Sequence, residues 1–143
     1  MDEHARDLRL RRTYGITLDE YKAMLAFQGE CCGICKRPQE TFKNSLSVDH
    51  WHNHTKVHIE SRKGIGVIKE SRWVARAEYC GQTIELGGPT KSAAIRSVRK
   101  YLKRMSVRGL LCHFCNRGLR YYADDPVRLA NAAEYLRRHQ GVV

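Results

Sequence analysis

Apolar residues recur at helical spacing near the beginning of the chain. Residues 3–13 and 17–28 each have the pattern of an amphipathic helix. Thr17 followed three positions later by Glu20 is the capping-box pattern that begins a helix. The predicted core of this helical pair is Leu8, Tyr14, Leu18, Tyr21, Leu25 and Phe27.

The pattern changes to alternation in the middle of the chain. Strands are expected over roughly 64–69, 72–79 and 82–87. Cys80-Gly81-Gln82 forms a short turn between the last two of them. One face of the second strand should carry Trp73, Ala75, Ala77 and Tyr79, and the other face Val74, Arg76 and Glu78.

Two further helices are predicted towards the end of the chain. Thr90 is a suitable cap for a helix from about Lys91 to Met105, with Ala94, Ile95, Val98 and Leu102 as its apolar stripe. Asp125 followed by Pro126 is a typical helix start. The resulting helix, from about 126 to 139, should bury Leu129, Ala133 and Leu136 against its own subunit or a second one.

Composition narrows the class of partner. The 143 residues suit one ordinary domain or two very small ones, and their net charge is +11. Such a charge favours a polyanion, most often nucleic acid, over the alternative of a merely solvated basic surface. No apolar run reaches the roughly 18 residues of a membrane span. The first residues lack the apolar core of a signal peptide, so we expect a cytoplasmic protein whose cysteines bind metal rather than form disulfides.

Two cysteine pairs have the spacing of zinc knuckles. Cys32 and Cys35 form the first pair, and Cys112 and Cys115 the second, with 76 residues between the pairs. Two such turns supply the four thiolates of a structural zinc site, whereas the alternative is four buried free thiols. Because the gap is much longer than in a compact zinc ribbon, a folded segment is expected between the pairs.

The remaining cysteines and one histidine are weaker ligand candidates. Cys31 could replace Cys32, but it would leave a less suitable spacing to Cys35. His113 lies inside the second knuckle, where a complete set of thiolates needs no further ligand. Cys80 has no partner at metal spacing and is expected to be a small apolar strand residue.

A histidine-rich stretch, SLSVDHWHNH, lies at residues 45–54. Residues 46–52 have the pattern of a strand, with Val48, His50 and His52 on one face and Asp49 on the other. Aspartate is a hard oxygen ligand suited to Mg²⁺, and a neighbouring histidine can remove a proton from water. A second zinc site or solvent-facing polar residues are equally compatible with this stretch alone.

The order of these motifs resembles a known family. A CxxC pair, VDHWH and then VRGLLCHFCN are arranged as in the recombination endonuclease VII family, a branch of the HNH, or ββα-metal, nucleases. The resemblance covers about half of the chain and implies an α+β, zinc-stapled ββα-metal core formed by residues 1–58 and 106–143. It implies zinc on Cys32, Cys35, Cys112 and Cys115.

The same resemblance implies the catalytic residues. Asp49 and Asn116 would bind a catalytic Mg²⁺ or Mn²⁺, with Asn116 opening a helix, and His50 would be the general base. His52 would contact the phosphate or the ion, whereas His54 and His58 match nothing in the family pattern. Junction-resolving members carry an acidic residue where this chain has Leu119, so the departure disfavours that specialisation but not hydrolysis.

Residues 59–105 form an insertion into the family pattern. Three strands, one helix and the sequences WVARA, IELG and TKSAAI resemble an AP2-type DNA-binding domain. Residues 55–106 also contain twelve basic and four acidic side chains, so +8 of the total charge lies here. The resemblance implies that the exposed sheet face reads bases and that Lys69 and Lys91 contact phosphate; the candidate readers are Arg72, Arg76, Glu78, Thr83 and Glu85.

We therefore expect a metal-dependent DNA endonuclease of homing type, phage-encoded or mobile and acting in the bacterial cytoplasm. The alternatives are a resolvase of branched DNA and a non-catalytic, zinc-stapled DNA-binding protein. A homodimer and a monomer that nicks one strand both remain open.

Overall fold

The computed structural model of the protein describes residues 2–51, 60–63 and 73–140. This part of the chain is mixed α+β, with five α-helices, one short 3-10 helix (Gln39–Thr41) and five strands. It divides into two compact units, Met1–Ala23 with His50–Arg108 and Met24–Asp49 with Gly109–Val143. None of the described helices combines the length and apolarity needed to cross a membrane.

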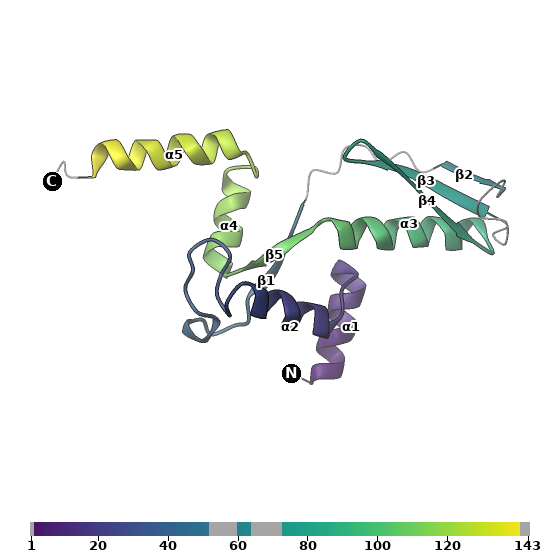
Figure 1. Ribbon diagram of the computed structural model, residues 1–143, viewed down its shortest axis with the longest axis horizontal. Helices are drawn as coiled ribbons and strands as arrows, with labels where there is room; N and C mark the ends of the chain where they lie inside the picture. The colour runs from purple at the N-terminus through teal and green to yellow at the C-terminus, as the bar shows by residue number, and fades with distance from the viewer. Residues whose placement is uncertain (1, 52–59, 64–72, 141–143) are drawn as a thin grey trace. The chain divides into compact units, whose positions relative to one another are not determined.

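Helices α1 (Glu3–Tyr14) and α2 (Leu18–Phe27) open the chain (Figure 1). α1 ends at Gly15, whose φ of 74° is easily adopted only without a side chain. The predicted capping box begins α2: the Glu20 N–H donates to Thr17 Oγ1 at 3.0 Å, and the Thr17 N–H donates to Glu20 Oε2 at 2.8 Å. Local sequence therefore fixes both the end of α1 and the start of α2.

The predicted core of these helices is only partly confirmed. Leu18, Tyr21 and Leu25 are buried, and Tyr14 is half-buried. The predictions for Leu8 and Phe27 are wrong, since both are exposed and Phe27 is 94% exposed. A helix turns by about 200° over two residues, so Phe27 lies on the face opposite to that of Leu25. The buried apolar positions that the prediction missed are Leu10 and Ile16.

An antiparallel sheet of three strands occupies the middle of the chain. β2 (Glu60–Lys63) pairs with β3 (Trp73–Tyr79), and β3 pairs with β4 (Gln82–Gly88). The predictions for β3 and β4 are confirmed to within a residue, whereas β2 has no apolar alternation and was missed. The expected strand at 64–69, together with Lys69 and Arg72, lies outside the described residues.

The turn of the β3–β4 hairpin contains Cys80. Cys80 and Gly81 have φ values of 50° and 76°, and Tyr79 pairs with Gln82 across them. Positive φ at both central residues identifies a two-residue type I′ turn, whose twist matches that of the flanking strands. The predicted turn is confirmed, with Cys80 and Gly81 as its central residues. Cys80 is thus an exposed turn residue, and the expectation that it is a small apolar strand residue is wrong because the hairpin reverses there.

Helix α3 (Lys91–Met105) covers one face of this sheet (Figure 1). The Ala93 N–H donates to Thr90 Oγ1 at 3.1 Å, which confirms the predicted cap. Gly88 lets the helix start close to the sheet, since a Cβ there would lie 2.6 Å from the Ala94 nitrogen. The shared core combines the predicted stripe of α3 with the predicted face of β3; its buried members are Ala75, Ala77, Ala94, Val98 and Leu102.

The second sheet has two hydrogen-bonded strands, β1 (Ser47–His50) and β5 (Val107–Leu111). Helix α4 (His113–Tyr121) follows β5 after a single residue, and α5 (Pro126–His139) follows α4. Asp125 caps α5 as predicted, with Oδ1 accepting from the Val127 N–H at 2.8 Å.

The burial predicted for α5 against its own subunit is only partly confirmed, and burial against a second subunit stays a prediction. Leu129 and Ala133 are half-buried, and Leu136 is 60% exposed. The predicted helix itself is confirmed at Pro126–His139. Helical periodicity shows which side chains share a face, but it does not show whether another surface covers that face.

Candidate metal centre and active site

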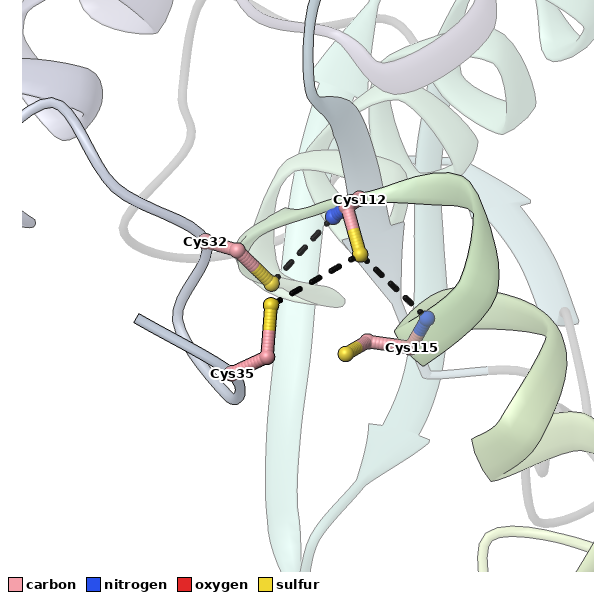
Figure 2. A group of neighbouring side chains, drawn as sticks. All are labelled: Cys32, Cys35, Cys112 and Cys115. Carbon is pink, nitrogen blue, oxygen red and sulfur yellow. Dashed lines mark hydrogen bonds between the residues drawn. The ribbon is translucent and has the colours of Figure 1, made fainter. Parts of the chain in front are cut away.

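Four thiols converge where the two cysteine pairs meet. Figure 2 shows the sulfur atoms of Cys32, Cys35, Cys112 and Cys115 gathered around a common point. All four Sγ atoms lie within 4.8 Å of one another, and those of Cys35 and Cys112 are 3.9 Å apart. Tetrahedral zinc with Zn–S bonds of about 2.3 Å requires sulfur atoms about 3.8 Å apart. The predicted grouping is confirmed, and its donor set fits structural zinc.

Backbone groups shape both knuckles. The Cys112 N–H donates to Cys32 Sγ at 3.3 Å, and the Cys115 N–H donates to Cys112 Sγ at 3.5 Å. In the first knuckle the Cys32 N–H donates to the Arg37 carbonyl at 3.0 Å, and Lys36 takes a φ of 59° to complete the turn. Burial opposes ionisation of the Cys32 thiol, but the backbone N–H donors around its sulfur lower the pKa of Cys32 below its usual value.

The cluster contains thiols of very different acidity. The backbone N–H and the guanidinium of Arg37 lower the pKa of Cys35 to about 6. Burial, followed by hydrogen bonding with neighbouring thiols, raises the pKa of Cys115 to about 12. At neutral pH the metal-free cluster would therefore be partly protonated, and binding a metal ion would release protons.

Gln28 joins the first knuckle to β5, and sequence reasoning missed it. Its Oε1 accepts from the Leu110 N–H at 2.8 Å, and its Nε2 donates to the Leu110 carbonyl at 2.9 Å and to the Cys31 carbonyl at 3.0 Å. A Cβ at Gly109 would lie 2.8 Å from Gln28 Oε1, so glycine leaves room for this amide. Nothing in the periodicity marks a lone glutamine after a helix as a clamp.

Asp49 and His50 end strand β1. Asp49 is 6% exposed, and it is one of two buried polar residues in the described part of the chain, the other being Ser106. A buried carboxylate is costly unless other groups or a metal ion compensate its charge. His50 is half-buried, with its ring edge-on to Tyr14 at a centroid distance of 5.2 Å. The predicted strand is shorter than expected, and His52, His54 and His58 lie outside the described residues.

Asn116 is the fourth residue of α4 and is half-buried. The prediction that it opens this helix is wrong, because Cys112 is the N-cap and the Asn116 N–H already donates to the Cys112 carbonyl at 3.0 Å. Asp49 lies on β1, and Asn116 lies on the helix that directly follows β1's paired strand, β5. The strand that carries Asp49 thus pairs with the strand that leads, through Cys112, into the helix that carries Asn116.

His113 is the first residue of α4 and is exposed. Its ring lies 5.8 Å from that of Phe114, and it is not part of the four-cysteine cluster. Cys31 is also outside the cluster, and it forms an isolated backbone bridge with Pro38. The choice of Cys32 over Cys31 as a cluster member is confirmed.

The candidate base-reading residues pair with one another on β3 and β4. Arg76 Nε donates to Glu85 Oε1 at 2.7 Å, and the two strands place these residues opposite each other. Thr83 Oγ1 donates to Glu78 Oε1 at 2.7 Å in the same manner. Lys91 is exposed at the start of α3. A base contact by Arg76 would therefore compete with an existing ion pair.

A sequence profile described as recombination endonuclease VII matches residues 7–138. The chain belongs to the recombination endonuclease VII family. This match spans both cysteine pairs, Asp49, His50 and Asn116, as well as the segment between the pairs.

Two phage proteins are similar to this endonuclease VII family member. The "Gene 59 protein" of Mycobacterium phage D29 is 30% identical over 137 residues, which are 95% of this chain and 52% of the relative. The "Gene 59 protein" of Mycobacterium phage L5 is 50% identical over 46 residues, 32% of this chain and 27% of the relative. The chain spans about half the length of the first of these relatives and about a quarter of the second. No solved structure matches the chain.

Proposed function

We propose that this chain is a metal-dependent DNA endonuclease that hydrolyses phosphodiester bonds. The single observation that carries the proposal is the family match over residues 7–138. The four-cysteine cluster supports it, because it joins the segment before β1 to the helix after β5. Two strands and a short helix bury little apolar surface, so a bound zinc ion would supply much of the stability of this part of the protein.

The proposed active site is formed by Asp49, His50 and Asn116. A carboxylate and an amide oxygen are the hard donors that Mg²⁺ or Mn²⁺ accepts, and such an ion would polarise the phosphate and stabilise the leaving oxyanion. The burial of Asp49 fits a carboxylate whose charge is compensated locally. Asn116 is neutral, so it adds a ligand without adding a second negative charge near the DNA.

His50 is the proposed general base. Its imidazole takes a proton from the attacking water at a ring nitrogen, and the edge contact with Tyr14 restricts the orientation of the ring. A general base of this kind contributes roughly 10²- to 10⁴-fold in rate. His52 is proposed to contact the phosphate or the metal ion.

Residues 59–105 are proposed to be an AP2-like module that reads the DNA site. The observed three-stranded sheet with one covering helix supports this interpretation. Phosphate contacts carry no base information, so a nuclease core that contacts only the backbone needs another element for sequence preference. The face of β3 and β4 that carries these residues offers arginine, threonine and glutamate side chains suited to base edges; Glu78 and Thr83 are exposed, and Arg76 and Glu85 are half-buried.

Resolution of branched DNA is the second candidate. The family's description as a recombination endonuclease favours it. Leu119, a half-buried residue of α4, stands where the resolving members have an acidic side chain, and this disfavours it. The two mycobacteriophage relatives support a phage-encoded enzyme that acts inside a bacterial host.

One assay compares the candidates directly. The zinc-loaded protein is incubated with Mg²⁺ and a linear duplex, a supercoiled plasmid or a four-way junction, and each set is repeated without Mg²⁺. Site-specific cuts in the linear duplex support the homing-type enzyme, whereas cleavage only at the junction supports the resolvase. Binding of DNA without cleavage of any substrate would contradict the nuclease proposal and leave a zinc-stapled DNA-binding protein.

A further inference from the structure

A basic groove lies between α1 and α3, on the side of the insert helix that does not face the sheet. It has a volume of about 560 Å³ and is lined by Arg11, Arg12, Arg96, Arg99, Lys100 and Lys103, together with Ala93 and Ser97. Within the part of the chain that the structure describes, no acidic side chain lines it. All of the lining residues belong to one compact unit.

The periodicity of α3 separates the groove from the core. The buried positions Ala94, Val98 and Leu102 recur every four residues and face the sheet. The four basic residues that α3 contributes to the groove also recur at helical spacing, but they are centred about 150° around the helix from that stripe. The groove face of α3 is therefore not required for packing on the sheet, and its side chains are available to a ligand.

α1 supplies the second wall of the groove. Gly15, which ends α1, approaches α3 so closely that a Cβ would lie 3.2 Å from the Lys100 carbonyl oxygen. Lys103 Nζ donates to the Arg12 carbonyl at 3.2 Å, and the nearby Arg104 forms an ion pair with Glu20 of α2. These contacts hold the end of α1 beside α3, so the basic side chains of both helices are brought to the same groove.

The positive charge in the groove is poorly compensated. Arg11 pairs with Asp7, but Arg96, Arg99 and Lys100 form no ion pair with any carboxylate that the structure describes. Six cations gathered in one groove repel one another, so a bound polyanion would relieve that repulsion. None of the six is among the residues of the insert that the sequence predicts to contact bases or phosphate.

The geometry favours the backbone of a nucleic acid over other anions. Arg96 and Lys103 are separated by about 10 Å along the axis of α3, at 1.5 Å per residue. One DNA strand carries a charge about every 3.4 Å along the duplex axis, so this distance corresponds to about three phosphates. A membrane surface fits poorly, because interfacial helices need large apolar side chains beside their cations and the groove has only Ala93.

We propose that the groove between α1 and α3 binds the phosphate backbone of duplex DNA, as a site that shares no residue with the predicted base-reading face or the predicted active site. This inference rests on DNA being the substrate of the proposed endonuclease. The groove would add sequence-independent affinity and fix the insert on the duplex, because phosphate contacts set position rather than specificity.

The test measures how binding depends on salt. Zinc-loaded protein is titrated without Mg²⁺ against a fluorescein-labelled random-sequence duplex, over a series of KCl concentrations, by fluorescence anisotropy. A triple variant carries Arg96→Gln, Arg99→Gln and Lys100→Gln, and a matched control carries Arg128→Gln, Arg137→Gln and Arg138→Gln on α5. Both variants lose three positive charges, so the control reports the effect of net charge alone.

The plot of log K against log[KCl] has a negative slope. The groove variant should make this slope shallower by roughly 0.9 for each phosphate that it no longer neutralises, about 2 to 3 in all. The α5 control should make the slope shallower by less than about 0.9. An equal change in both triple variants would overturn the proposal, because net charge would then explain the effect. Tighter binding of single-stranded RNA than of the duplex, with the same dependence on the groove, would also overturn it.

Two further variants keep the test decisive if the triple variant folds poorly. Arg96→Gln alone should make the slope shallower by roughly 0.9. A separate double variant, Arg96→Lys with Arg99→Lys, keeps both charges and should have the same slope as the parent. A single substitution without effect on the slope would contradict the groove site. The titration contains no Mg²⁺, so it measures DNA binding whether or not the protein cleaves DNA. Cleavage by the parent protein with Mg²⁺ tests the endonuclease proposal separately.

Discussion

The side-chain amide of Gln28 satisfies both backbone groups of Leu110. Its Oε1 accepts from the Leu110 N–H at 2.8 Å, and its Nε2 donates to the Leu110 carbonyl at 2.9 Å. Leu110 lies two residues before Cys112 and is fully buried. The contact therefore sets the spacing between the first cysteine knuckle and the strand that leads into the second.

Replacing Gln28 with glutamate should destabilise the protein. The carboxylate keeps an acceptor for the Leu110 N–H but loses the donor to the Leu110 carbonyl, so two oxygens would face each other. A buried group left without a partner costs about 1–3 kcal/mol. Urea denaturation of the zinc-loaded variant measures this change in the free energy of unfolding.

Gln82→Glu is the matched control for that substitution. Gln82 lies exposed at the β3–β4 turn, where most substitutions change stability by less than about 0.5 kcal/mol. Equal stability of the Gln28→Glu and Gln82→Glu variants would show that the clamp on Leu110 contributes nothing.

Adjacent cysteines allow a sharp test of the metal centre. Cys32→Ser should lower zinc affinity by orders of magnitude and lower the melting temperature, because it removes one of four thiolates. Cys31→Ser should retain one zinc ion per chain, since Cys31 is outside the cluster. Elemental analysis after dialysis measures the zinc content, and loss of zinc from Cys31→Ser with retention in Cys32→Ser would reverse the ligand assignment.

Cys35 should react at lower pH than Cys115 in the metal-free protein. The pKa of Cys35 is lowered to about 6 and that of Cys115 is raised to about 12, so only Cys35 of these two is mainly thiolate at neutral pH. Alkylation of Cys35 by iodoacetamide should rise with pH through about 6 and then level off, whereas that of Cys115 should still be rising as the pH approaches about 12. Peptide mass spectrometry measures both rates.

Arg37→Gln is the control for this acidity. The variant removes the guanidinium but keeps the backbone N–H, so it should move the midpoint of Cys35 part of the way towards higher pH. Because the pKa of Cys35 is lowered in the folded state, its thiolate stabilises the fold, and this stabilisation is lost as the pH falls through about 6. An unchanged midpoint in Arg37→Gln would contradict the assigned cause.

Much of the local structure could be predicted from the sequence, because its causes are local. Thr17 and Glu20 form their capping box within four residues, and Thr90 caps α3 in the same way. The cysteine cluster was also predictable, since thiol pairs at this spacing fit few arrangements other than a shared metal ion. These features need no knowledge of distant packing.

What the sequence did not reveal depends on contacts between distant segments. Phe27 and Leu10 are both apolar residues on helices, and only the tertiary fold decides that Leu10 is buried and Phe27 is exposed. Gln28 reaches a backbone 82 positions away, and no periodicity encodes that contact. β2 was missed because an edge strand of sequence ESRK lacks the apolar alternation by which strands are recognised.

Arg76→Ala should reduce discrimination between DNA sites more than total affinity. An arginine–guanine pair contributes about 1–3 kcal/mol of discrimination, and in this fold part of that is offset by breaking the pair with Glu85. Lys91→Ala should instead weaken binding to all sequences alike and lower the salt slope by about 1. Competition between duplexes with single base changes separates the two effects. An equal loss of affinity for all duplexes in Arg76→Ala would show that Arg76 does not read bases.

The most direct test of the central claim is single-turnover cleavage by His50→Ala with Mg²⁺, compared with His4→Ala, which changes an exposed histidine in α1. His50→Ala should cut roughly 10²- to 10⁴-fold more slowly while its DNA affinity and zinc content match those of the parent. His4→Ala should cleave at the parent rate. Equal cleavage rates for His50→Ala and the parent would show that His50 is not the base and contradict the proposed active site.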